Sequence, residues 1–141
     1  MATIVAGQIA TAAVLNTLQS VVLTNTAGSA AANSTTPVQI AAGSFTAVAG
    51  TRPAVVMAQC NIQSTVATDL GRVTVNVDGV EVARYQLVPG AAGSAGVAFG
   101  AALGSLTLLG GDHTWTVTVL RVTGTGTVTG GLSLLTIQDA T

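Results

Sequence analysis

The residue best suited to chemistry is His113, the single histidine of the chain, which follows Gly110, Gly111 and Asp112. Its neighbour Asp112 would be the natural partner in a hydrolytic pair, because such a pair must share a hydrogen bond. The segment, however, has the pattern of a turn entering a β-strand, in which consecutive side chains point to opposite faces. We therefore interpret His113 as an ordinary turn residue and not as a catalytic one.

No other group of residues supports catalysis, a cofactor or a metal site. Cys60 is the single cysteine, so one chain can form neither an internal disulfide nor a thiolate metal cluster, and we interpret it as a small buried residue. The glycine-rich stretch 90–96 lacks the lysine and the following helix of a phosphate-binding loop. Ser94 lacks the first glycine of a nucleophile elbow. The sequence predicts a protein that is not an enzyme, with no catalytic, cofactor-binding or metal-ligating residues.

A sugar-binding module is the second class of function that the residues allow, and sugar rings pack on exposed aromatic side chains. Trp115 alternates with two valines in 114–119, which indicates a core position. Tyr85, next to Arg84, is the better platform, although packing within a hairpin strand is the preferred interpretation. Contact with a host surface glycan is therefore an alternative function. The aromatic residues are Phe45, Tyr85, Phe99 and Trp115.

Charged side chains are scarce. Asp, Glu, Lys and Arg make up 6% of the 141 residues, against about 25% in an ordinary soluble domain. The four cations are all arginine and nearly balance five acids, so no basic stripe is available for nucleic acid. A freely diffusing protein keeps roughly a quarter of its surface charged, and we therefore expect other chains to cover much of this one. Mutational bias is the alternative explanation, and it accounts for the missing lysine better than for the missing acids.

The N-terminal segment matches neither a secretory signal nor a membrane span. No basic residue precedes its first apolar stretch, and Asn16 and Gln19 interrupt that stretch. We expect the chain to be made and assembled in a host cytoplasm, with no membrane as a partner.

A short helix is predicted in the same segment. Thr11 can cap it, and Leu15, Leu18 and Val22 recur at the spacing of one helical face. The small-residue stretch 24–34 that follows has the composition of a linker. These features predict an attachment segment and linker over residues 1–35, with Thr11, Leu15, Leu18 and Val22 contacting the partner, and a separate domain over residues 36–141.

From residue 36 onward, short runs of Val, Thr, Ile and Leu alternate with turn residues, which is typical of β-strands. Two alternating runs flank Asp78-Gly79, a pair that favours a tight hairpin turn. The number and spacing of these runs predict a mainly β domain, an antiparallel jelly-roll-like β-sandwich. The predicted strands are 36–41, 44–48, 54–63, 71–77, 80–87, 95–100, 103–109, 113–123 and 126–138.

Two of these runs, 54–58 and 132–137, carry apolar side chains on both faces. The core of a sandwich covers one face, and a neighbouring subunit is the natural cover for the other. We therefore predict a self-association interface at Leu134, Leu135 and Ile137.

The opening residues Ala6–Asn16, AGQIATAAVLN, resemble the "AGQ-x-x-TAA-x-LN" start of many small virion proteins of tailed bacteriophages. The resemblance covers about the first twenty residues closely, and the remainder is similar only in style to trimeric jelly rolls. It implies a homotrimer in the virion, attached through its N-terminus to a major capsid protein as a capsid decoration or head-fibre protein. A minor tail or receptor-binding tail protein is the alternative that the same motif allows.

Overall fold

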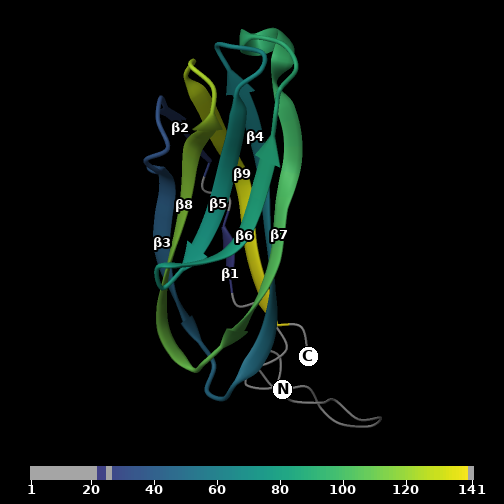
Figure 1. Ribbon diagram of the computed structural model, residues 1–141. Coiled ribbons are helices and arrows are strands. Elements are labelled where there is room, and N and C mark those ends of the chain that lie inside the picture. Colours follow the sequence, from purple (N-terminus) through teal and green to yellow (C-terminus); the bar gives the residue numbers. More distant parts are fainter. Residues whose placement is uncertain (1–21, 25–26, 140–141) are drawn as a thin grey trace, which may run out of the picture.

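The computed structural model describes residues 22–24 and 27–139, which form a nine-stranded antiparallel sheet (Figure 1). The β-rich body is therefore confirmed. One 3-10 turn, η1 (Gly93–Gly96), lies between two strands, and among the described residues no helix is long and apolar enough to cross a membrane. The strands are β1 (Val22–Thr24), β2 (Gly28–Ala32), β3 (Val38–Ala47), β4 (Arg52–Ser64), β5 (Leu70–Val77), β6 (Val80–Leu87), β7 (Ala98–Leu108), β8 (Gly111–Thr123) and β9 (Val128–Asp139).

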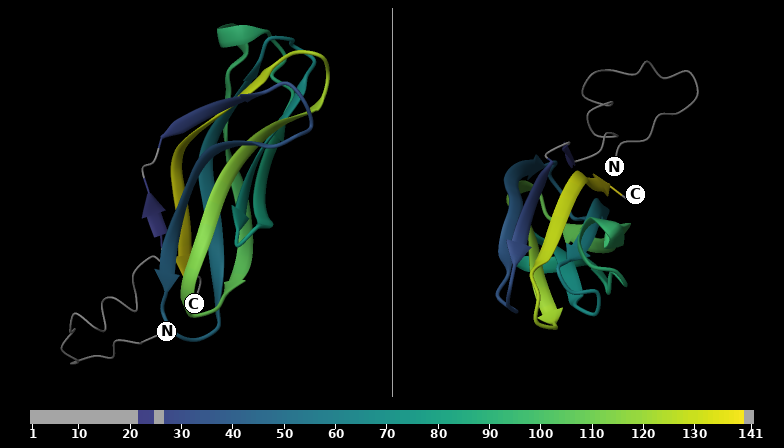
Figure 2. Two further views of the ribbon diagram at one scale, coloured as in Figure 1. Left: turned by 90° about the vertical axis from the view of Figure 1, so that its left-hand side faces the viewer. Right: turned by 90° about the horizontal axis from the view of Figure 1, so that it is seen from above.

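The sheet has two halves that face each other across a shared core (Figure 2). Its strand order is β1-β9-β4-β7-β6-β5-β8-β3, and β2 also pairs with β9. The halves meet where β6 pairs with β7 through Ala83 with Gly104 and Arg84 with Leu103. Because this junction is so short, the sheet can curl around its own apolar face, and the end-on view shows strands enclosing the core.

The core follows from side-chain alternation along each strand. Trp115, Val117 and Val119 of β8 are all buried, as predicted. The Trp115 ring lies so close to Gly43 of β3 that a Cβ there would come within 2.7 Å of it, so this position accepts only glycine. The largest fully buried apolar side chains of the described residues are Val56, Ile62, Val73, Val75, Val117, Val119, Val128, Leu135 and Ile137.

The predicted hairpin at Asp78-Gly79 is confirmed. β5 and β6 pair from Gly71 with Leu87 to Val77 with Val80. The two turn residues have φ values of 51° and 80°, the left-handed backbone that Asp-Gly tolerates in a two-residue turn. The predicted strands 36–41 and 44–48 are one continuous strand, β3. The predicted strands 95–100 and 103–109 are likewise one strand, β7.

The end of the predicted N-terminal helix is wrong. Val22 belongs to β1, whose Val22–Thr24 backbone pairs with Ile137–Leu135 of β9. A β-branched run and the open hydrogen-bonding edge of β9 favour a strand over an isolated helical turn. The other residues of the predicted helical face, Thr11, Leu15 and Leu18, lie outside the described residues.

The small-residue stretch 24–34, in which we expected a linker, also contains a strand. β2 pairs with β9 from Gly28 with Leu132 to Ala32 with Val128. The composition did not predict this strand, because glycine, serine and alanine side chains bury little apolar surface and resemble those of a linker. Small side chains are nevertheless required, since a Cβ on Gly28 would lie 2.9 Å from the carbonyl oxygen of Ile40 in β3.

Candidate functional site

His113 lies at the end of the domain where the β5–β6 hairpin turn and the β7–β8 turn meet. Its Nδ1 is 2.7 Å from Oδ2 of Asp78, and its Nε2 is 2.8 Å from the carbonyl oxygen of Leu109. Both partners only accept hydrogen bonds, so the protonated imidazole, with a donor on each nitrogen, satisfies both contacts, and the site favours the cationic form. The Phe45 ring stacks on it with a centroid distance of 5.2 Å.

This arrangement is a structural clamp. Asp78 also accepts a hydrogen bond from the backbone amide of Thr114, 2.9 Å away. The hydrogen bonds to Asp78 and to the Leu109 carbonyl raise the pKa of His113 above its ordinary value, and the His113 hydrogen bond lowers the pKa of Asp78. The adjacent Asp112 is instead bonded by the Thr46 hydroxyl at 2.7 Å. A histidine with both nitrogens occupied as donors has no lone pair with which to act as a general base.

The clamp predicts how stability depends on pH. Because folding raises the pKa of His113, its contribution is complete below the ordinary value of about 6.5 and is lost as pH rises through the folded-state pKa. The Asp78 contribution is lost on the acid side, as pH falls below about 3.8 through its lowered pKa. NMR titration of the single imidazole should give a value above 6.5, and Asp78→Asn should move it down. A value at or below 6.5 in the folded protein would contradict the clamp.

The second notable region is the outer face of β7, β4 and β9, three strands that lie side by side (Figure 1). We call the outward side chains of these strands the β4 face. All are at least partly exposed and none is charged. They are Pro53, Val55, Met57, Gln59, Asn61 and Gln63 of β4, Phe99, Ala101, Leu103, Ser105 and Thr107 of β7, and Thr129, Ser133, Leu134, Thr136 and Gln138 of β9.

The half of the β4 face toward the start of β4 exposes aliphatic side chains set between polar ones, and we call it the apolar half. Val55 lies between Ser105 and Gln138, and Met57 lies between Leu103 and Thr136. Val55 is 48% and Leu103 64% exposed. Met57 lies directly opposite Leu103, and Leu134, which is opposite Gln59, is the diagonal neighbour of Met57. Leu103, Met57 and Leu134 therefore form a diagonal row across the three strands. Large apolar side chains gathered on an uncharged surface are typical of an interaction site.

The other half of the β4 face, toward the end of β4, is polar but uncharged, and we call it the amide half. Gln59, Asn61 and Gln63 alternate along β4, so three side-chain amides follow one line. Phe99 lies opposite Asn61 and is 78% exposed. Beside it is an open hollow of about 430 Å³, here called the Phe99 hollow, lined by Gln59, Cys60, Phe99, Gly100, Ala101 and Ser133.

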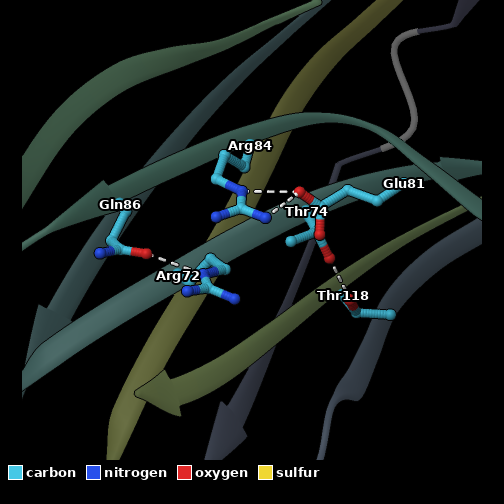
Figure 3. Close-up of polar contacts among 6 residues, drawn as sticks. All are labelled: Arg72, Thr74, Glu81, Arg84, Gln86 and Thr118. Atoms are coloured by element: carbon cyan, nitrogen blue, oxygen red, sulfur yellow. Dashed lines mark hydrogen bonds and ion pairs between the residues drawn. The ribbon is translucent and has the colours of Figure 1, made fainter. Parts of the chain in front are cut away.

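The charged side chains of β5 and β6 lie on the other half of the sheet (Figure 3). Arg84 pairs with Glu81 at 2.6 Å, and Nε of Arg72 donates to Oε1 of Gln86 at 2.8 Å. Exposed pairs of this kind contribute about 0–1 kcal/mol each. Arg84 lies opposite Leu103, so its ion pair with Glu81 borders the apolar half of the β4 face, while the outward side chains of the face itself carry no charge.

The predicted interface residues fall in two different environments. Leu135 and Ile137 are 0% exposed, so their side chains belong to the core of this chain and cannot reach a partner. Leu134 points outward into the apolar half of the β4 face. A register shift between Gln59 and Cys60 causes this, because it inserts one extra residue into β9 and reverses the alternation.

The aromatic side chains also fall in different environments, since Trp115 and Tyr85 pack in the core and Phe99 is exposed. Trp115 is buried, and the Tyr85 ring packs against Gly100 on the core side, which supports the packing interpretation of both. Sequence reasoning missed Phe99 as the exposed ring and missed the Asp78–His113 pair. The alternation of Gln59, Asn61 and Gln63 was a readable signal for the amide half.

The sequence matches no protein-family model and has no significant match among curated proteins. Similar solved structures include the C-terminal domain of EclA, a sugar-binding protein, with a TM-score of 0.54 and 13% identity over 82% of this chain and 79% of that one. Another is the insecticidal delta-endotoxin Cry8Ea1 from Bacillus thuringiensis, with a TM-score of 0.50 and 11% identity over 79% of this chain and 19% of that one. At these identities the likeness shows the fold alone.

Proposed function

We propose that this chain is a non-enzymatic structural protein of a virus particle, most simply a capsid decoration or head-fibre protein of a tailed phage. The observation that carries the proposal is the uncharged β4 face, whose apolar half exposes Val55 and Leu103. Interface cores are depleted of charged residues. A surface of this kind is suited to permanent contact with other chains of an assembly.

Self-association is the first role of the apolar half. Copies of one chain meet at symmetry-related surfaces, and an uncharged face has no like charges to oppose such a contact. Met57, Leu103 and Leu134 lie together there with Val55. The trimeric state is inferred from the resemblance of the N-terminus to phage virion proteins.

Attachment to the capsid is assigned to the residues that precede β1. Val22, where the described chain begins, is opposite Ile137, which is itself opposite Val56. The preceding segment therefore joins the domain beside the apolar half of the β4 face. Several anchors tethered in one oligomer would multiply weak single contacts through effective concentration.

The strand order supports the jelly-roll interpretation of the fold. One half of the sheet has the order β3-β8-β5-β6, and the other has β2-β9-β4-β7. Consecutive strands such as β2 and β3, β4 and β5, and β7 and β8 lie in different halves, so the chain crosses between the halves several times. This arrangement fits the eight-stranded jelly roll, an architecture common in viral capsid proteins.

The test is deletion of residues 1–21, which leaves β1 intact. The truncated protein is expected to stay folded and oligomeric in sedimentation but to lose binding to particles that lack this protein. Binding equal to that of the full chain would contradict the assignment of the anchor to the N-terminus. A stable monomer of the full chain at micromolar concentration would contradict the proposed self-association.

A tail location is the second candidate, and the same N-terminal resemblance allows it. Copy number in purified particles separates the two, since a decoration protein covers the shell in many copies and a tail protein occurs in few. The exposed Phe99 ring is the structural feature that favours a receptor-binding role.

A further inference from the structure

We infer that the Phe99 hollow binds a neutral saccharide. This inference concerns the amide half of the β4 face, so it does not depend on whether the apolar half packs against another copy. It rests on the exposed ring, on the line of amides beside it and on the absence of charge.

Phe99 has the geometry of a stacking platform. Its side chain is 78% exposed, more than any other large apolar side chain in the described residues. The next residue, Gly100, lies directly over the Tyr85 ring, because a Cβ there would come within 2.4 Å of that ring. Tyr85 therefore supports the backbone of the platform from the core side. The C–H groups on one face of a sugar ring pack favourably on the negative face of an aromatic ring.

Hydrogen-bonding groups of β4 and β9 lie on one side of the platform. Gln59 and Gln63 flank Asn61, which lies opposite Phe99, and each amide can both donate and accept. Ser133 is placed on this face by the register shift in β9, and its hydroxyl donates to the carbonyl oxygen of Gln59 at 3.2 Å. That hydroxyl oxygen can still accept. A sugar presents hydroxyl groups around its rim that need both kinds of partner.

The lining selects the class of ligand. No charged side chain belongs to the β4 face, so nothing there would pair with a phosphate, a sialic acid or an amine. The hollow combines the Phe99 ring with the amide of Gln59 and the hydroxyl of Ser133, groups on which a sugar can stack and to which it can form hydrogen bonds. Its volume of about 430 Å³ falls in the range of roughly 300–1,000 Å³ for small-molecule sites.

The test is saturation-transfer NMR on the full chain with a panel of neutral mono- and oligosaccharides, with a sialylated glycan as the charged comparison. Binding of at least one neutral sugar is expected, weakened about tenfold by Phe99→Ala and retained by Phe99→Trp. Gln59→Ala should also weaken it. Val80→Ala, which truncates a 65% exposed apolar side chain on β6 away from the β4 face, is the control and should leave sugar binding unchanged.

Three outcomes would overturn the inference. The first is that no neutral sugar binds at millimolar concentration. The second is that a sugar binds but Phe99→Ala leaves the binding unchanged. The third is that the chain binds no sugar and Phe99→Ala dissociates the oligomer, which would assign Phe99 to self-association. Circular dichroism verifies that each variant is folded. Sedimentation of the same samples reports self-association separately, so failure of the sugar site and failure of the proposed virion role are distinguishable.

Discussion

Leu135→Asp is expected to unfold the domain, whereas Leu134→Asp is expected to leave it folded and dissociate the oligomer. Leu135 is 0% exposed, and an unpaired carboxylate in its place should lower the free energy of unfolding by about 4 kcal/mol or more. Leu134 lies in the apolar half of the β4 face. A charge there stays hydrated in the monomer and is desolvated only in the assembly.

The measurements are urea unfolding for stability and sedimentation velocity for assembly, at one fixed protein concentration because oligomers gain stability by mass action. Leu103→Asp is the second test of the same surface, since Leu103 lies on β7 opposite Met57. Gln39→Asp, on an exposed position of β3 in the other half of the sheet, is the control for an added charge. If Leu134→Asp and Leu103→Asp both leave the oligomer intact, the apolar half is not the self-association surface.

Asp69→Ala is the second change with a large expected effect. Asp69 is fully buried, and its carboxylate accepts hydrogen bonds from the Ser64 hydroxyl at 2.7 Å and from the amides of Thr125 and Gly126 at 3.1 and 2.9 Å. The carboxylate therefore holds the β8–β9 turn against the β4–β5 loop. Removing it leaves two backbone amides without partners, each at a cost of about 1–3 kcal/mol. We expect a loss of about 3–5 kcal/mol in the free energy of unfolding.

The pKa of Asp69 provides an independent check. Burial alone would raise that pKa, but the hydrogen bonds from Ser64, Thr125 and Gly126, together with nearby Arg121, outweigh burial and lower it. The stabilising contribution is thus present above about pH 3.8 and is lost as pH falls through the folded-state pKa. Asp112→Asn is the control, because Asp112 is exposed and should change stability by about 0.5 kcal/mol or less. An equal effect of the two substitutions would show that the Asp69 network contributes little.

The local features of the fold were readable in the sequence. The Asp78-Gly79 turn is specified by two adjacent residues that accept a left-handed backbone. The buried face of β8 follows from simple alternation around Trp115. β2 was not readable, because its glycine, serine and alanines carry no periodic signal, and its partner is the distant strand β9.

The sequence by itself determined which side chains alternate, where the tight hairpin turns and how little charge the surface can carry. The tertiary structure decided which residues meet. His113 was expected to be an isolated turn residue, but the strand order brings Asp78, 35 positions away, to its ring. Leu134 and Leu135 could not be assigned to faces, because one extra residue in β9 shifts the register. The pleat of a strand follows from local backbone geometry, whereas strand order, register and bulges depend on contacts between segments far apart in the chain.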